Sequence, residues 1–331
     1  MTSYRIFCVY TFLSLTLVLS GCSQPPSIVK SEYQYQYTQD KVVDARLSKN
    51  GHYTALLDIN NLTLCNNQNR SVLSTWATPF NAYHTAISND NKRLVIAGKF
   101  RVAIFEAGNE QPTRQWDPQS FVNHATVILI QLHDSGNVVL VGMSDGGILF
   151  FDLRNGLHSK FAMHMGPVSQ LIYQSSAAIW SFSTDGSIAL WQPSDGKLLK
   201  EYQLPHRVMA LAVSDKLMFA ADNLYTQKIW TQGDNKVLAE LDIERGWLFL
   251  KNALFVDNNS KLLTASTKQH IWLWDSQTGK MLSHWQLKIF SLGSHLLDWG
   301  INEQGHLQTI NSDGVLELWP KTRFVGQHLS S

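Results

Sequence analysis

The chain has 331 residues, of which 27 are Lys or Arg and 26 are Asp or Glu, and its formal net charge is +1. Charged residues make up only 16% of the sequence, and no basic run is present, so the long-range positive field of a nucleic-acid-binding protein is missing. The length is ample for a large buried core. These features indicate a neutral globular protein whose partners are not nucleic acids.

The first 21 residues predict a secretion signal. Arg5 supplies a positive charge, and residues 6–19 form an uncharged, mostly apolar stretch. This stretch is too short for a membrane-spanning helix, which needs about 20 residues. It is followed by Leu19-Ser20-Gly21-Cys22, which resembles the lipobox of bacterial lipoproteins. The resemblance implies cleavage before Cys22 and a covalent lipid on its sulfur. A plain secretion signal that happens to precede a cysteine is the alternative.

The lipobox resemblance also implies a location. A lipidated Cys22 would anchor the protein to a membrane of the bacterial cell envelope, and Ser23 is compatible with the outer membrane, facing the periplasm. Cys8 would leave with the signal, so Cys65 would remain as a single thiol that cannot form an internal disulfide. We expect Cys65 to be a small buried residue and not a reactive thiol.

A pattern of strand, Asp-Gly turn and strand ending in Trp or Phe recurs along the rest of the chain. Clear copies span residues 144–151, 184–191 and 312–319, and weaker copies end at Cys65, Phe105, Trp230 and Trp274. Successive copies end 39 to 46 residues apart. A period near forty, with four short strands in each repeat, predicts a β-propeller.

The outermost strands of the repeats support this register. They end in a large apolar residue ten or eleven positions after the end of the third strand, at Trp76, Trp116, Phe161, Tyr202, Leu241 and Trp285. The seventh repeat lacks such a strand, whereas residues 33–37 read Tyr-Gln-Tyr-Gln-Tyr, a strand pattern outside any repeat. We expect residues 33–37 to pair with the seventh blade, which would close the ring and cover an exposed strand edge.

The predicted fold is therefore all-β, a seven-bladed β-propeller of four-stranded antiparallel blades, closed by an N-terminal strand that pairs with the C-terminal blade. The predicted domains are a signal peptide (1–21), the lipidated cysteine with a tether (22–31), the propeller (32–324) and a C-terminal tail (325–331).

The repeats resemble those of the WD-repeat (WD40) propeller family from about residue 42 to residue 321. Trp274-Asp275 is the Trp-Asp pair of that family, and other repeats keep only the Trp. Members of the family also carry a His before the innermost strand and an Asp in the turn between the second and third strands, linked by hydrogen bonds. The resemblance implies such a structural set in the fourth repeat, formed by His164, Ser183, Asp185 and Trp191.

The sequence predicts neither a catalytic residue nor a metal site. The loop histidines belong to different repeats, and no close spacing of His, Cys and Asp gives a metal-ligand pattern. Residues 142–146 match the Gly-x-Ser-x-Gly pattern of hydrolases, but they align with strand-to-strand turns, whereas the hydrolase motif needs a strand-to-helix turn. We expect no enzyme activity and no cofactor apart from the lipid on Cys22.

The remaining functional signal lies in the loops that join one blade to the next. Residues 244–251 depart most from the repeat, and exposed aromatic residues and Arg are enriched at protein interfaces. We predict a partner-binding surface formed by Arg207, Arg245, Trp247 and Phe249. The alternative is that the loop aromatics pack inward and cap the blades.

We expect this lipid-anchored propeller to act as a protein-protein interaction scaffold for envelope proteins. The alternative is a small-ligand-binding or enzymatic propeller that uses the mouth of a central channel. The innermost strands offer mainly Val, Ala, Leu and Ile, with Asp44 and Asp298 as exceptions, which argues against catalysis. Converging carboxylates or histidines would favour the alternative, and an apolar, aromatic-rimmed face would favour the scaffold.

Overall fold

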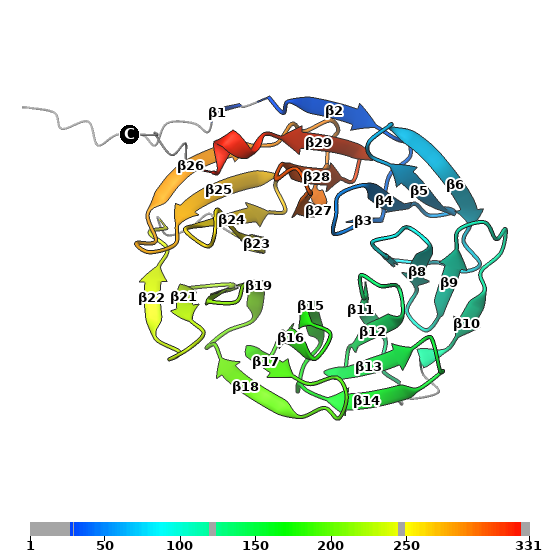
Figure 1. Cartoon of the computed structure of the whole chain (residues 1–331), viewed down its shortest axis with the longest axis horizontal. Helices are drawn as coiled ribbons and strands as arrows, with labels where there is room; N and C mark the ends of the chain where they lie inside the picture. The colour runs from blue at the N-terminus through cyan, green and yellow to red at the C-terminus, as the bar shows by residue number, and fades with distance from the viewer. Residues whose placement is uncertain (1–26, 29, 119–123, 244–248, 326–331) are drawn as a thin grey trace, which may run out of the picture.

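The computed structural model describes residues 27–28, 30–118, 124–243 and 249–325. Seven sheets surround a common axis, and the chain runs outward through each blade from the innermost strand (Figure 1). The predicted seven-bladed propeller is confirmed.

Blades one to five each contain four strands, antiparallel to their neighbours. Blade one has β3 (Asp44–Leu47), β4 (Tyr53–Leu57), β5 (Asn61–Asn66) and β6 (Ser71–Ala77). Blade two has β7 (His84–Ile87), β8 (Arg93–Ala97), β9 (Val102–Glu106) and β10 (Arg114–Trp116). Blade three has β11 (Val127–Leu132), β12 (Val138–Met143), β13 (Gly147–Asp152) and β14 (His158–Ala162). Blade four has β15 (Val168–Ser175), β16 (Ala178–Ser183), β17 (Ser187–Trp191) and β18 (Leu198–Gln203). Blade five has β19 (Val208–Val213), β20 (Leu217–Asp222), β21 (Gln227–Thr231) and β22 (Val237–Glu240).

Blades six and seven each include a strand from the N-terminal part of the chain. Blade six has β23 (Leu250–Val256), β24 (Lys261–Ser266), β25 (His270–Asp275) and β26 (Met281–Gln286), with β1 (Ser27–Ile28) outside β26. Blade seven has β27 (Leu296–Ile301), β28 (Leu307–Asn311) and β29 (Val315–Trp319), with β2 (Tyr33–Gln36) as its outermost strand. A short 3₁₀ helix, η2 (Lys321–Arg323), follows.

The strand β2 closes the ring as the sequence predicts. It pairs antiparallel with β29, from Tyr33 opposite Leu318 to Gln36 opposite Val315 (Figure 1). The guanidinium carbon of Arg70 lies 3.8 Å from the centre of the Tyr33 ring, which joins the closing strand to blade one. The closure therefore depends on contacts with both the last and the first blade.

The strand β1 was not predicted. It pairs parallel with the edge of blade six, with Ser27 opposite Trp285 and Ile28 opposite Gln286. A strand of two residues carries no alternation that could reveal it in the sequence. The segment 22–31, predicted as a tether, thus includes residues that are paired with the propeller.

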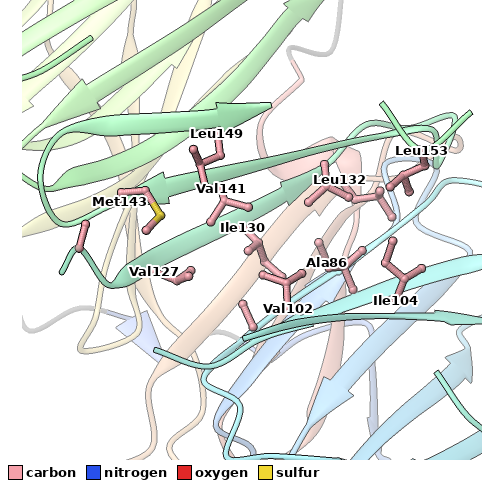
Figure 2. Close-up of a cluster of buried hydrophobic side chains, with 14 residues drawn as sticks. Ala86, Val102, Ile104, Val127, Ile130, Leu132, Val141, Met143, Leu149 and Leu153 are labelled. Carbon is pink, nitrogen blue, oxygen red and sulfur yellow. The ribbon is translucent and has the colours of Figure 1, made fainter. Parts of the chain in front are cut away.

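The core lies between neighbouring blades. Figure 2 shows one cluster, formed by blades two and three, in which buried side chains of the two sheets interdigitate: Ala86, Val102, Ile104, Val127, Ile130, Leu132, Val141, Met143, Leu149 and Leu153. A blade that buries both faces needs apolar residues on consecutive positions, which explains runs such as that of β13.

The third-strand endings also lie in this core. Trp191 and Trp319 have no exposed surface, and Cys65 occupies the equivalent position in blade one. Burial raises the pKa of the Cys65 thiol to about 12. The thiol is therefore protonated and inert at neutral pH, as expected for a buried structural cysteine.

Among the described residues, no helix has the length and apolar character required to cross a bilayer.

Candidate functional site

Two sets of loops share one face of the ring. They are the loops that join consecutive blades and the turns between the second and third strands, since antiparallel strands reverse direction at every turn. Main-chain hydrogen bonds connect the two sets: Asn223 N donates to Arg207 O at 3.0 Å, and Leu287 N donates to Gln269 O at 2.8 Å. We call this the joining face, and we call the other side the opposite face.

In blade four, a chain of hydrogen bonds leads from the joining face to a buried tryptophan. Trp191 Nε1 donates to Ser181 Oγ at 3.1 Å, and Ser181 Oγ lies 2.7 Å from His164 Nε2. At the other nitrogen of the imidazole, His164 Nδ1 lies 2.5 Å from Ser187 Oγ, which donates to Asp185 Oδ1 at 2.6 Å. Because an ionised carboxylate only accepts, His164 donates from Nδ1 to Ser187 and accepts at Nε2 from Ser181.

The structure corrects one member of the predicted set. His164, Asp185 and Trp191 are brought together, but Ser183 is not a link between them. Its hydroxyl donates to Gly166 O at 2.8 Å and accepts a hydrogen bond from Asp185 N at 3.2 Å. Ser183 is the last residue of β16 and bonds the adjacent loops, whereas Ser181 lies two residues deeper, level with the indole of Trp191.

The sequence does contain a pattern that identifies Ser181, which is a hydroxyl residue at a fixed distance before the buried tryptophan. In blade six, Trp274 Nε1 donates to Thr264 Oγ1 at 2.8 Å, and in blade seven, Trp319 Nε1 donates to Thr309 Oγ1 at 3.2 Å. In all three blades the hydroxyl precedes the tryptophan by ten residues. The offset of ten residues therefore identifies Ser181, whereas the loop pattern pointed to Ser183.

The protonation states indicate that this series of hydrogen bonds in blade four has a structural role. Burial lowers the pKa of His164 to about 4, against the opposing effect of the Asp185 carboxylate. Burial alone would raise the pKa of Asp185, but hydrogen bonds from Ser187 and from the backbone of Met165 and Gly166 outweigh it and lower that pKa to about 2. Ser181 has no exposed surface. A substrate cannot reach the Ser181 hydroxyl, although a serine, a histidine and an aspartate follow one another along this series of hydrogen bonds.

The joining face carries most of the exposed large apolar side chains of the described residues. The loops of the opposite face carry Leu157 alone, and the others lie on outermost strands. On the joining face they are Val43, Ile59, Tyr83, Phe100, Met165, Leu224, Tyr225, Phe249, Ile289 and Leu292.

Two of the four predicted surface residues lie on this face, and the other two lie outside the described residues. Phe249 is 61% exposed, and Arg207 is exposed beside the turn that presents Leu224 and Tyr225. Arg245 and Trp247 belong to the segment that the structure does not describe, as does Cys22.

The inward-packing alternative holds for some of the loop aromatics. Phe80 packs against the core between blades one and two. Phe290 is half-buried, with Lys288 Nζ at 4.7 Å from the centre of its ring. Tyr83 and Phe249 instead remain exposed. The sequence did not distinguish these cases, because both kinds of residue occur in equivalent loops.

Titratable side chains of four blades also meet around the axis. Asp44 and Arg46 come from β3, His84 from β7, Lys251 from β23 and Asp298 from β27. Each member acts electrostatically on at least one of the others across blades. Only the innermost strands, which converge on the axis, bring these blades so close (Figure 1). We call these five residues the axial cluster.

The two carboxylates of the axial cluster join neighbouring blades. Asp44 Oδ2 accepts from the backbone N of Thr85 in blade two at 2.8 Å, and Asp44 Oδ1 lies 3.1 Å from Arg46 Nη1. Asp298 Oδ2 accepts from the backbone N of Leu47 in blade one at 2.8 Å. Burial raises the pKa of Asp298 to about 6, although Arg46 and the Leu47 N–H oppose the shift.

Burial also shifts the pKa values of two basic members of the axial cluster. Burial lowers the pKa of His84, and it also lowers the pKa of Lys251, with the charge of Arg46 acting in the same direction. Within the described ranges, Lys251 has no ion pair with an acid. The charge of Asp44 acts on Lys251 in the opposite direction.

A hollow of about 290 Å³ lies on the opposite face and is lined by residues that include Asp90, Arg93, Glu106 and Asn137. Arg93 bonds both Glu106 and Asn137 there. In the part of the chain that the structure describes, no group of three or more His, Cys, Asp and Glu side chains could hold a metal ion.

Comparisons with known proteins agree with this architecture. No family model matches the sequence. Pre-mRNA-processing factor 17 of Homo sapiens is 23% identical over 237 residues, which cover 65% of this chain and 40% of that protein. Telomerase protein component 1 of Mus musculus is 25% identical over 210 residues, which cover 57% of this chain and 8% of that protein. The chain therefore spans less than half the length of these curated relatives.

A solved structure matches over nearly the whole chain. A chain of the crystal structure of the mitotic checkpoint complex superposes with a TM-score of 0.71 and 14% identity, covering 96% of this chain and 98% of that one. The ring of seven blades and these likenesses identify the fold as a WD40-like β-propeller.

Proposed function

We propose that the protein is a lipid-anchored interaction scaffold of the bacterial cell envelope, facing the periplasm from the outer membrane. Cys22 would carry the lipid, and the joining face would bind a partner protein. The observation that carries this proposal is the distribution of exposed apolar side chains. They are frequent in the loops of the joining face, whereas the loops of the opposite face contribute only Leu157 among the described residues. Exposed apolar groups gathered on one surface are typical of protein contacts.

A rigid ring suits this role. The core between blades holds the loops in place, so binding costs little conformational entropy. Large, exposed anchors such as Phe249 and Tyr225 are the kind of side chain that dominates interface energy. The matching chain of known structure is part of the mitotic checkpoint complex, which supports a general role of this fold in assembly.

A catalytic role has less support. The serine of the buried His164 chain is inaccessible, and the axial carboxylates Asp44 and Asp298 already accept main-chain hydrogen bonds. The axial cluster is still the one observation that favours the second candidate function, a ligand site at the centre of the ring.

The scaffold proposal is tested by capture of partners after crosslinking in detergent-solubilised envelopes. We expect the double variant Phe249→Ser, Tyr225→Ser to lower the yield of the main captured protein about tenfold or more, because truncation of two exposed anchors costs at least 1–2 kcal/mol. Leu157→Ser is the matched control, because Leu157 is 65% exposed on the opposite face and Phe249 is 61% exposed. Equal capture by all three proteins, with unchanged melting curves, would contradict a partner site on the joining face.

A further inference from the structure

The outer edge of blades four, five and six exposes apolar side chains that the joining face does not include. They lie on the outermost strands β18, β22 and β26, and they are Leu198, Leu199, Val237, Met281 and Leu282. Consecutive residues of a strand point to opposite faces of the sheet, so an adjacent pair such as Leu198 and Leu199 would not both be exposed between packed blades. Both are exposed because the blades diverge towards the perimeter of the ring (Figure 1). We call these five residues the rim surface.

Hydrogen bonds between neighbouring blades make the rim surface continuous. The end of the outermost strand of one blade meets the turn between the third and fourth strands of the next blade. From blade four, Tyr202 Oη donates to Asn235 Oδ1 of blade five at 2.6 Å. From blade five, Asp242 N donates to Gly279 O of blade six at 2.9 Å. In both turns, an exposed apolar residue of the rim surface lies two positions further along the chain.

Other parts of the perimeter are more polar. The outermost strand of blade two exposes residues 114–115, which are Arg and Gln, and that of blade three exposes residues 158–160, which are His, Ser and Lys. Blade seven presents β2, in which the exposed Tyr35 lies between two glutamines. Val72 and Leu73 of blade one are exposed as well, but blade seven separates them from the rim surface. The rim surface is therefore an aliphatic arc on three consecutive blades.

The first strand of the described chain lies beside the rim surface. β1 pairs parallel with β26, and Ser27 lies opposite Trp285. The N-terminal end of β1 thus points towards the start of β26, where Met281 and Leu282 lie. Leu282 is three positions before Trp285, which is about 10 Å along the strand. Because an extended chain from Cys22 to Ser27 spans at most about 18 Å, a lipid on Cys22 would enter the bilayer close to the rim surface.

The chemistry of the rim surface suits a lipid interface. In each of the three blades an exposed lysine directly precedes the apolar residues, at Lys197, Lys236 and Lys280. The carbon stem of a lysine can lie on apolar surface while its ammonium stays among headgroups and water. The carboxylates of Asp195 and Asp234 lie in the same turns and accept from the backbone N of Lys197 and Lys236. The surface therefore carries both signs of charge, and its apolar side chains are the groups that would favour a bilayer.

We propose that the rim surface rests on the lipid bilayer, so that the ring stands on edge with blades four to six at the membrane interface. The inference rests on the proposed lipid anchor and specifies the orientation in which the anchor holds the ring. An anchor keeps the propeller at a high effective concentration beside the membrane, so a small apolar contact suffices to orient it. With the ring on edge, the joining face stays open to a partner protein.

Spin labels measure this orientation in the lipidated protein, purified from membranes and reconstituted into vesicles of phosphatidylethanolamine and phosphatidylglycerol. The labels are attached to Leu199→Cys and Leu282→Cys, and Cys65 does not react because it is fully buried. Leu73→Cys in blade one is the control for Leu199→Cys, since the native residues are 44% and 43% exposed. Leu224→Cys on the joining face is the control for Leu282→Cys, since the native residues are 50% and 49% exposed.

The quantity measured is the collision rate of each label with oxygen, which partitions into the bilayer, and with a nickel chelate, which stays in water. We expect both rim labels to lose accessibility to the chelate and to gain accessibility to oxygen on reconstitution, whereas both controls remain accessible to the chelate. Rim labels as accessible to the chelate as their controls would overturn the proposal. Protection that appears only with several copies in each vesicle would indicate contact between copies, and it would overturn the proposal as well.

A pair of charged variants tests whether the apolar side chains cause the protection. The label is placed at Val237→Cys, between the other two blades of the rim surface. Leu198→Glu with Met281→Glu should restore its accessibility to the chelate, because two carboxylates oppose insertion into the interface. Val72→Glu with Leu73→Glu adds the same charge in blade one and should leave the label protected. Protection that survives in both double variants would overturn the role of the rim surface.

The failure of this inference differs from a failure of the anchor. If Cys22→Ala leaves the membrane fraction but the rim labels of the lipidated protein stay accessible to the chelate, the orientation is wrong and the anchor stands. If Cys22→Ala stays with the membranes, the lipid anchor is wrong and the inference falls with it. Neither result alters the capture test of the joining face.

Discussion

At the scale of single residues, blade four buries a hydroxyl that has a partner on both sides. The Ser181 hydroxyl accepts from the Trp191 indole and donates to His164 Nε2. All three groups are buried, so loss of the hydroxyl would leave an indole N–H and an imidazole nitrogen without partners. An unsatisfied buried group costs about 1–3 kcal/mol.

Ser181→Ala should therefore lower the free energy of unfolding by about 1–3 kcal/mol, measured by urea denaturation. Ser181→Thr is the matched variant, because blades six and seven carry Thr264 and Thr309 at the same offset from their tryptophans. It keeps the hydroxyl and should remain close to wild type. A Ser181→Ala protein as stable as Ser181→Thr would show that the chain contributes nothing to stability.

At the scale of elements, the closing strand β2 covers a buried acid. Glu317 of β29 is only 1% exposed and accepts from Gln34 Nε2 at 2.9 Å and from Ser31 Oγ at 3.2 Å. Burial raises the pKa of Glu317 to about 7, although these hydrogen bonds and the charge of Lys288 act against it. Between the ordinary pKa of a glutamate and pH 7, the folded protein holds a proton that the unfolded chain has lost. Stability therefore falls as the pH rises through this window.

Glu317→Gln should remove this dependence. The amide keeps an oxygen that accepts from Gln34 but carries no charge, so the variant should be about 1–3 kcal/mol more stable than wild type at pH 8, with a smaller difference at pH 5. The measurement is urea unfolding at both pH values. Glu201→Gln, at an exposed position of β18, is the control and should follow the wild-type profile. A pH profile of Glu317→Gln parallel to that of wild type would contradict a buried, raised-pKa acid beneath β2.

The elements also show which features could be predicted from the sequence. The closure could be predicted because the repeat period is regular, the seventh repeat lacks its outermost strand, and residues 33–37 form a strand pattern outside any repeat. The prediction of Ser183 as a member of the hydrogen-bonded set was wrong, because Ser181 lies on the same strand face and is the serine that the Trp191 indole reaches. Of the axial cluster, the sequence identified Asp44 and Asp298 as polar exceptions on the innermost strands. It did not identify Arg46, His84 and Lys251 as their neighbours, since the members are distant along the chain and are brought near the axis only by the curvature of the ring.

At the scale of the whole molecule, the path of the N-terminal segment would determine how a lipid-anchored ring sits at a membrane. β1 and β2 run along the outer edges of blades six and seven, so the chain leaves the propeller at its rim (Figure 1). An extended chain from Cys22 to Ser27 spans at most about 18 Å. If Cys22 carries the lipid, the rim at blade six stays near the bilayer, and both faces, including the joining face, remain open to the periplasm.

Cys22→Ala should transfer the full-length protein from the membrane fraction to the soluble fraction of fractionated cells. Without the Cys22 sulfur no lipid can be attached, so the protein loses the membrane affinity of the acyl chains, about 0.8 kcal/mol for each buried methylene. None of the described residues forms a helix that could anchor the protein in place of the lipid. Cys8→Ala, within the predicted signal peptide, is the control and should remain with the membranes. The released variant should keep the wild-type melting curve, because Cys22 precedes Ser27, the first paired residue of the part of the chain that the structure describes. Membrane association of Cys22→Ala equal to that of Cys8→Ala would contradict the lipid anchor while leaving the propeller and its joining face unaffected.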